Sequence, residues 1–324
     1  MALHQRTLRI GLMAILCALV FRLSSMDVVG WMNGMLSSSG ITSYLISLQT
    51  GQDVRFSPSA EVYSPQFVET PPPVTPGEKK PPKPFYADPE IITLQDTANV
   101  KPDVVQLLQQ PLQWELYGEQ PTVLIVHTHT TESYTKAGQR YAETAAYRTL
   151  DEQYNMLHIG SIVAEALCRQ GISVIHDRQI HDYPSYNGSY SSARKAVADY
   201  LAQYPSICLV LDLHRDASAG NGAQLKTLTY GAAVPTAQLM IVLGTNHPGY
   251  AQNLSLGLKI HAQLEQQAPG ITRPLQLRTQ RFNQDLMPGM LLVEVGAAGN
   301  THAEAESAAR QLAQAIIALA RGTE

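Results

Sequence analysis

The stretch VLIVHTHTTESY, residues 123–134, begins as an unbroken run of Val, Leu and Ile and ends with two histidines and a glutamate. Four similar apolar runs follow it: ISVIHD (172–177), SICLVLDLH (206–214), AQLMIVLGT (237–245) and MLLVEVG (290–296). Apolar runs without polar alternation are typical of strands that are covered on both faces. These runs therefore predict a buried sheet whose strands are mostly parallel.

Segments with helical spacing lie between these runs. They are YNMLHIGSIVAEALCRQG (154–171), SSARKAVADYLAQYP (191–205) and GYAQNLSLGLKIHAQLEQQAPG (249–270). A last helix should begin after Thr301, because Thr301 and Glu304 have the spacing of a capping box. The alternation predicts an α/β fold, with one open, twisted, mostly parallel sheet of about six strands and helices on both faces.

The N-terminus has the pattern of a membrane-targeting segment. Arg9 precedes IGLMAILCALVF, which is uncharged and ends before Arg22. This run is shorter than the ~20 residues of an ordinary membrane span and matches the apolar part of a signal sequence. No clear small-x-small cleavage site follows, so we expect an uncleaved anchor at residues 1–26. The basic residues before the apolar run predict that the rest of the chain is extracytoplasmic.

Residues 27–89 are expected to form a linker, although residues 27–52 could instead be a short amphipathic segment that contacts the membrane surface or a partner. The part from residue 56 onward, FSPSAEVYSPQFVETPPPVTPGEKKPPKPFYADPE, is dense in proline. Proline restricts the backbone and removes hydrogen-bond donors, so this segment is expected to be an extended extracytoplasmic spacer. The folded domain should then occupy residues 90–324.

Composition and motifs exclude several classes of function. The net charge of −4 does not indicate a nucleic-acid partner, and three scattered cysteines cannot form a disulfide framework or a thiolate zinc site. The motifs of serine hydrolases with a nucleophile elbow and of nucleotide-binding proteins are absent. A TIM-barrel amidohydrolase also begins with His-x-His, but eight strand–helix units need about 250 residues, and only about five strands are visible.

Polar side chains gather where the predicted strands end. His127 and His129 close the first run, His214 closes another, and Glu294 lies inside the last. Active sites in open α/β sheets form at the carboxyl ends of the strands. Residues i and i+2 of a strand share a face, so both histidines of HTH could bind one metal. Imidazoles and carboxylates are ligands that zinc accepts.

Glu294 is the most informative of these residues. Burying an isolated charge costs several kcal/mol, so this carboxylate needs a cation, hydrogen-bond donors or a shifted pKa. A salt bridge to an arginine such as Arg215 would satisfy the same need without any catalytic role.

Several blocks of the sequence occur together in a known family. VLIVHTHTTESY, YN at 154–155, VIHD, HDYPSYNGSY, LVLDLHRDA, LGTN and VEVGAAGNT resemble, in order and spacing, the stage II sporulation protein P family of spore-forming Firmicutes. The resemblance covers residues 90–324. It implies a fold like that of zinc-dependent N-acetylmuramoyl-L-alanine amidases. It also implies cleavage of peptidoglycan, at the amide between glycan and peptide and at peptide cross-links, during engulfment of the forespore.

The resemblance also implies a set of zinc ligands. His129 matches the first ligand, with His127 as its competitor, and His214 matches the third. The second ligand of the amidases is a glutamate shortly before a helix-opening asparagine. Here Asp151 lies four residues before Asn155, with Glu152 beside it, and Glu132 or His127 could serve instead.

The resemblance implies a role for Glu294, and the chemistry of the neighbouring residues suggests roles for Arg215 and for one loop. Glu294, in an E-x-G context with Asn300 downstream, matches the catalytic glutamate that moves the proton of the attacking water. Arg215 would stabilise the oxyanion or bind a substrate carboxylate; an ion pair with Asp212 or Asp216 is the structural alternative. The loop HDYPSYNGSY (181–190) has three tyrosines and no core pattern, which fits either a substrate-facing loop that stacks on sugar or peptide, or an ordinary surface loop.

The family resemblance implies partners as well as chemistry. It implies work beside a lytic transglycosylase, stage II sporulation protein D, and a membrane scaffold, stage II sporulation protein M. The alternative from another functional class is a catalytically inactive scaffold that binds the cell wall and keeps the same fold without the metal.

Overall fold

The computed structural model describes residues 60–64, 87–112, 114–135, 148–217, 225–229 and 234–322. Most of the predicted linker and the whole predicted anchor, residues 1–26, lie outside these ranges. None of the helices formed by the described residues is both long enough and apolar enough to cross a bilayer.

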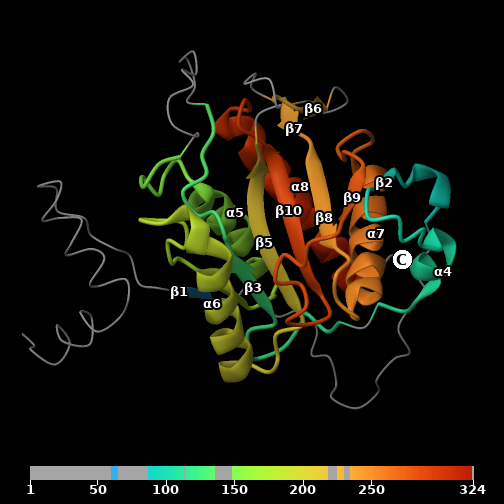
Figure 1. Ribbon diagram of the computed structural model, residues 1–324, viewed down its shortest axis with the longest axis horizontal. Coiled ribbons are helices and arrows are strands. Elements are labelled where there is room, and N and C mark those ends of the chain that lie inside the picture. Colours follow the sequence, from blue (N-terminus) through green and yellow to red (C-terminus); the bar gives the residue numbers. More distant parts are fainter. Residues whose placement is uncertain are drawn as a thin grey trace, which may run out of the picture. The chain divides into compact units, whose positions relative to one another are not determined.

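An eight-stranded sheet organises the described residues, with the order β1-β4-β3-β5-β10-β8-β9-β2 (Figure 1). Five of its seven strand pairs are parallel, and the pairs β1–β4 and β10–β8 are antiparallel. The strands are β1 Ala60–Tyr63, β2 Leu94–Asp96, β3 Val123–Val126, β4 Val174–Asp177, β5 Leu209–Asp216, β8 Leu239–Gly244, β9 Leu275–Arg278 and β10 Met290–Ala297. β6 Leu228–Thr229 and β7 Thr236–Ala237 form a separate pair.

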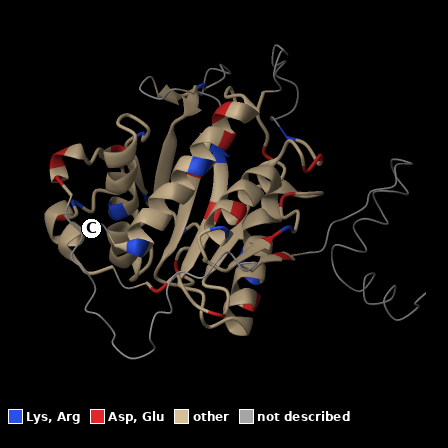
Figure 2. Cartoon of the chain, turned by 180° about the vertical axis from the view of Figure 1, so that it is seen from behind, with Lys and Arg blue, Asp and Glu red and all other residues tan. Residues whose placement is uncertain are grey.

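Helices cover the two faces of the sheet unequally. α5 (Met156–Cys168), α7 (Tyr250–Gln267) and α8 (His302–Arg321) pack on one face, with α4 (Val104–Gln109) against α7. α6 (Ser189–Gln203) packs on the other face, through Ala193 and Val197. Figure 2 views the chain from behind, where positions of acidic and basic residues are interspersed along the helices. Two short 3-10 helices, Pro89–Ile91 and Tyr186–Gly188, complete the regular structure of the described residues.

The prediction of a mostly parallel sheet is confirmed, but the number of strands is eight instead of six. The extra strands are short, and their sequences do not form long apolar runs. β1 lies within the predicted linker, where Ala60–Tyr63 pairs with β4 and forms one edge of the sheet. The predicted capping box is present: the Thr301 side chain accepts from the Glu304 N–H, and the Glu304 carboxylate accepts from the Thr301 N–H.

The strands alternate strictly between the two faces. On β3, β5, β8 and β10 the odd-numbered apolar residues pack under α5, α7 and α8, and the even-numbered apolar residues face α6 or the loop that follows β9. β3, β5 and β10 are parallel neighbours, with Val126 beside Asp212 and His214 beside Glu294. The sheet therefore delivers Asp212, His214 and Glu294 to one face, near its carboxyl-terminal edge.

Candidate active site

His214 lies beside a buried carboxylate, at the distance of an ion pair. Its Nε2 lies 2.9 Å from Asp212 Oδ1. Thr128 fixes Asp212 in turn, because its N–H and hydroxyl donate to the two carboxylate oxygens at 2.8 and 2.6 Å. Burial would raise the pKa of Asp212, but the neighbouring His214 ring and the Thr128 donors hold it at about 2. Nδ1 of His214 is left to face the interior of the site.

Glu132 lies at Nδ1 of His214, and the His129 ring packs against the His214 ring. The rings of His129 and His214 lie edge to face, with centroids 5.2 Å apart, and Glu132 Oε2 lies 3.6 Å from His214 Nδ1. His129 Nδ1 is buried and has no hydrogen-bond partner among the described residues. We call His129, Glu132, His214 and Glu294 the His214 group.

Glu294 completes the group from the neighbouring strand, where it pairs in register with His214. Its Oε2 is buried and has no hydrogen-bond partner among the described residues. Burial raises the pKa of this carboxyl above its usual value, and the His214 ring only partly offsets that effect. A carboxyl with a raised pKa can take up and return a proton near neutral pH.

The charges around the His214 group do not balance. Glu132, Glu294, Asp212 and Asp182 are four carboxylates, whereas Arg148 and Arg215 are the two guanidinium groups beside them. With neutral imidazoles the formal charge is −2. Burial disfavours protonation of His214, yet the carboxylates around it, Asp212 first, raise the pKa of this ring to about 10. Burial also raises the pKa of Glu294, so protons on His214 and Glu294 offset this excess of negative charge near neutral pH. A divalent cation bound here would take the place of those protons.

His127 takes part in a different interaction. β3 ends at Val126 and the chain then turns, so the expectation that His127 and His129 share a strand face does not hold. His127 lies under α5, where its Nε2 is 2.8 Å from Nε2 of His176 and its Nδ1 is 3.1 Å from the Leu213 carbonyl. Burial lowers the pKa of both rings. Both nitrogens of His127 are therefore engaged within the core.

Gly160 of α5 leaves the space that this histidine pair fills. A Cβ at residue 160 would lie 2.4 Å from His176 Nε2 and 2.5 Å from His127 Nε2. We expect Gly160→Ala to lower the free energy of unfolding by about 2 kcal/mol, because overpacking against two hydrogen-bonded rings outweighs the better helix propensity of alanine. Urea unfolding of the purified chain measures this difference.

Gly188→Ala is the matched control, because a Cβ there would meet no atom within 4 Å. It should leave the stability unchanged or slightly raised. If Gly160→Ala and Gly188→Ala were equally stable, His127 and His176 would have to move aside for the added methyl group at little cost in free energy.

The structure does not bring Asp151 to the His214 group. Asp151 is exposed, and its carboxylate accepts from the backbone N–H of Gln153 in its own loop. Glu152 forms an ion pair with Arg178 at 2.5 Å. Of the sequence-based alternatives for the second ligand, Glu132 is the one that reaches His214.

Arg215 points to the sheet face opposite His214. Its Nε donates to the Ser133 carbonyl at 3.0 Å, and its backbone N–H donates to Glu132 Oε2 at 3.1 Å. Its guanidinium lies 4.0 Å from the other oxygen of Glu132. This buried arginine holds Glu132 in place, and its side chain is almost inaccessible to solvent.

An aromatic loop covers His129. The Tyr186 ring stacks on His129, with centroids 4.5 Å apart, and the Tyr186 hydroxyl lies 3.2 Å from His129 Nε2. The Arg148 guanidinium lies 4.4 Å above the same tyrosine ring and also pairs with the buried carboxylate of Asp182. Tyr186 is nevertheless 52% exposed, so a substrate could reach its outer edge.

The donor chemistry of the His214 group fits zinc. Two imidazoles and a carboxylate are a common catalytic ligand set, and a metal-binding histidine usually donates its second N–H to a carboxylate, as the Asp212–His214 contact would allow. Within the described residues, no three His, Cys, Asp or Glu side chains converge closely enough to form a finished metal site. Metal binding would therefore require these side chains to move closer together.

Comparison with known proteins identifies the family. The family model for stage II sporulation protein P matches residues 68–317. The chain belongs to the stage II sporulation protein P family. Stage II sporulation protein P of Bacillus subtilis (strain 168) is 27% identical over 209 residues, which are 60% of this chain and 50% of that protein. The chain thus spans about half the length of this curated relative.

Solved structures with a similar arrangement are distant in sequence. An N-acetylmuramoyl-L-alanine amidase from Clostridium difficile 630 has 14% identity and a TM-score of 0.39, covering 64% of this chain and 100% of that chain. An N-formylglutamate amidohydrolase from Ralstonia eutropha JMP134 has 11% identity and a TM-score of 0.34, covering 64% and 96%.

Several contacts in this member of the stage II sporulation protein P family escaped sequence reasoning. Asp212, Arg148 and Asp182 surround the His214 group, but none was predicted to belong to it. Asp212 had a usable signal: in LVLDLH it lies two residues before His214, so both side chains must share a strand face. Arg148 and Asp182 come from loops and had no such signal.

Proposed function

We propose that this protein is a zinc-dependent peptidoglycan hydrolase that cleaves the amide between N-acetylmuramic acid and L-alanine. Family membership supports a role in sporulation. The observation that carries the chemistry is the position of His214. Asp212 lies at its Nε2, Glu132 lies at its Nδ1, the His129 ring packs against it, and Glu294 pairs with it in register.

His129, Glu132 and His214 would hold the metal. Bound zinc would lower the pKa of a water molecule to about 7 and polarise the scissile carbonyl. Asp212 would keep His214 aligned, since a second hydrogen bond fixes the ring and its tautomer. Arg215 would position Glu132 through its backbone N–H and its guanidinium.

Glu294 would serve as the general base and then as the general acid. Its buried oxygen has no hydrogen-bond partner among the described residues, so it remains available to a water molecule. Burial raises its pKa, which favours return of the proton to the departing amine. Tyr186 and Arg148 would form the edge of the site that meets the substrate.

The biological setting belongs to the same proposal. Membership of the sporulation family supports action on peptidoglycan during engulfment, with peptide cross-links as a second substrate. The catalytic domain would act between the mother-cell and forespore membranes, attached through the N-terminal segment. The lytic transglycosylase stage II sporulation protein D and the scaffold stage II sporulation protein M are the partners that this setting suggests.

The products of digestion test this function. Purified peptidoglycan incubated with the full chain and zinc should release intact stem peptides and leave glycan with free lactyl groups, because only the lactyl amide is cut. Mass spectrometry of the soluble and insoluble fractions identifies both products. Peptides whose cross-links have been cut would show that the protein also cleaves peptide cross-links.

Two controls give the experiment its meaning. A chelator should stop the release of stem peptides, and addition of zinc should restore that release. Absence of all products with zinc present would overturn the hydrolase and favour the catalytically inactive cell-wall scaffold, whose binding to insoluble peptidoglycan a pelleting assay would detect.

A further inference from the structure

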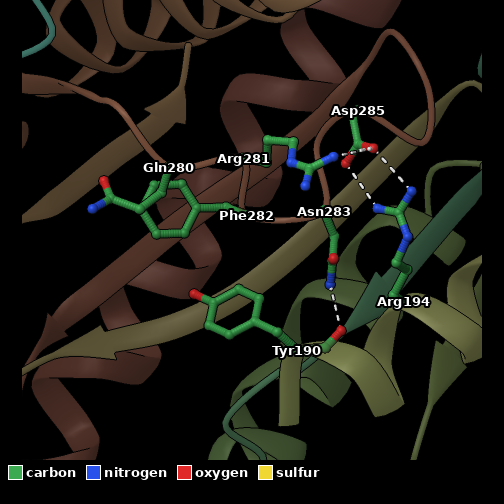
Figure 3. Close-up of a pocket in the computed structure, with 7 residues that line it drawn as sticks. All are labelled: Tyr190, Arg194, Gln280, Arg281, Phe282, Asn283 and Asp285. Carbon is green, nitrogen blue, oxygen red and sulfur yellow. Dashed lines mark hydrogen bonds and ion pairs between the residues drawn. The ribbon is translucent and has the colours of Figure 1, made fainter. Parts of the chain in front are cut away.

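A pocket of about 390 Å³ opens beside the His214 group (Figure 3). Its walls come from the start of α6 and from the loop that connects β9 with β10. The lining residues are Tyr190, Arg194, Gln280, Arg281, Phe282, Asn283 and Asp285. None of them has a role in the proposed chemistry.

Tyr190 is the wall between this pocket and the candidate active site. Its ring centroid lies 5.6 Å from that of His129 on one side and 6.1 Å from that of Phe282 on the other. Phe282 packs on Met240, Val242 and Leu292. These strand residues share the sheet face of Glu294, which follows Leu292 by two positions and pairs in register with Met240. A ligand that enters the pocket therefore lies on the same face as the catalytic carboxylate.

The pocket loop is held rigidly in its conformation. Gln284 accepts from the Gly244 N–H at 2.7 Å and donates to the Val242 carbonyl at 2.9 Å, which ties the loop to β8. Asn283 Nδ2 donates to the Tyr190 carbonyl at 2.8 Å.

The backbone at the centre of this loop is unusual. Phe282 and Asn283 adopt left-handed conformations, with φ of 49° and 58°, which non-glycine residues rarely do. Gly244 admits the loop, because a Cβ there would lie 2.3 Å from the Gln280 carbonyl oxygen. Such strain persists only where surrounding contacts enforce it, and it is common in binding sites.

The pocket carries a net positive charge. Arg194 forms a two-pronged ion pair with Asp285, at 2.8 and 2.9 Å, so their charges cancel. Arg281 is only 3.9 Å from the same carboxylate, and its side chain is 60% exposed. In Figure 3 both arginines flank Asp285, while the rings of Tyr190 and Phe282 lie on the other side of the pocket. The Arg281 guanidinium thus remains able to pair with an incoming anion.

We propose that this pocket is a subsite for the carboxylate-bearing stem peptide of the substrate. Arg281 pairs with a peptide carboxylate, Gln280 offers its amide to the peptide backbone, and the two rings contact apolar parts of the chain. A neutral sugar could stack on the two rings, but it has no negative charge to pair with the Arg281 guanidinium. The assignment of the ligand to peptidoglycan rests on the proposed function.

Binding of two synthetic compounds tests this subsite. The first is N-acetylmuramoyl-L-alanyl-D-glutamate, and the second is the same compound with both glutamate carboxylates converted to amides. The full chain carrying Glu294→Gln is titrated with each in a calorimeter, so that the compounds are not consumed. We expect the acid to bind about fivefold more tightly than the diamide, the size of one partly exposed ion pair.

Arg281→Gln should remove the preference for the acid, and Arg169→Gln is the matched control. The Arg169 side chain is 63% exposed and has one loose ion pair, with Glu165 at 3.8 Å on α5, so this variant should keep the preference. Equal binding of acid and diamide, binding of neither compound, or an unchanged preference in Arg281→Gln would each overturn the subsite. Failure of the hydrolase itself would appear separately, as absent products in the digestion of whole peptidoglycan by the wild-type chain.

Discussion

Glu294→Gln is expected to slow peptidoglycan hydrolysis by about 10³-fold while leaving zinc bound, because general acid–base groups contribute on this scale. Glutamine keeps the shape of glutamate but cannot accept and return a proton. The rate of stem-peptide release measures the loss of hydrolysis, and the zinc content of the purified variant shows whether the metal is retained.

The location of Glu294 explains why no other residue should replace it. It lies beside His214 on the adjoining strand, its Oε2 is buried without a hydrogen-bond partner among the described residues, and burial raises its pKa. Glu132 is the nearest rival, but its carboxylate already accepts from Arg215 and lies next to Arg148. In the proposed site Glu132 is a metal ligand, so its carboxylate is not available to move the proton.

Glu306→Gln is the control for the substitution itself. Glu306 lies on α8 and pairs with His158 and Arg310 near the surface, so its loss should leave the rate unchanged. If Glu294→Gln released stem peptides as fast as the wild type, another group would have to move the proton.

The central strands were predictable from the sequence because they are long, apolar and buried on both faces. The short outer strands were not. Ala60–Tyr63 lies in a proline-rich region, and its burial pattern shows two exposed residues between two half-buried ones. β2 and β9 have only three and four residues. Their pairing depends on neighbours distant in the chain, which local patterns do not record.

The candidate site was predictable to the extent that strand ends define it. His129, His214 and Glu294 come from the carboxyl ends of parallel strands or from within one of them, as the sheet argument requires. The rule of period two misplaced His127 because it assumes that the strand continues, whereas β3 ends one residue earlier. Contacts between loops, such as that of Arg148 with Asp182, depend on the folded backbone, so the spacing of residues in the sequence does not predict them.

Zinc binding by substituted chains should separate the possible ligands. The wild type is expected to bind about one equivalent of zinc, and His129→Ala and His214→Ala should lose it, because a three-ligand catalytic site does not survive removal of one imidazole. Asp212→Asn should bind zinc about 10-fold to 100-fold more weakly, since it loses the carboxylate that orients His214. Equilibrium dialysis followed by metal analysis gives both stoichiometry and affinity.

His127→Gln and Asp151→Asn should retain the full equivalent of zinc. Both nitrogens of His127 are engaged by His176 and by a backbone carbonyl, so its replacement should lower the free energy of unfolding by about 1–3 kcal/mol without removing a ligand. Asp151 is exposed and bonded within its own loop. Loss of zinc from folded His127→Gln would mean that the chain rearranges around the metal and breaks the histidine pair, and loss from Asp151→Asn would mean that the 149–155 loop closes over the site.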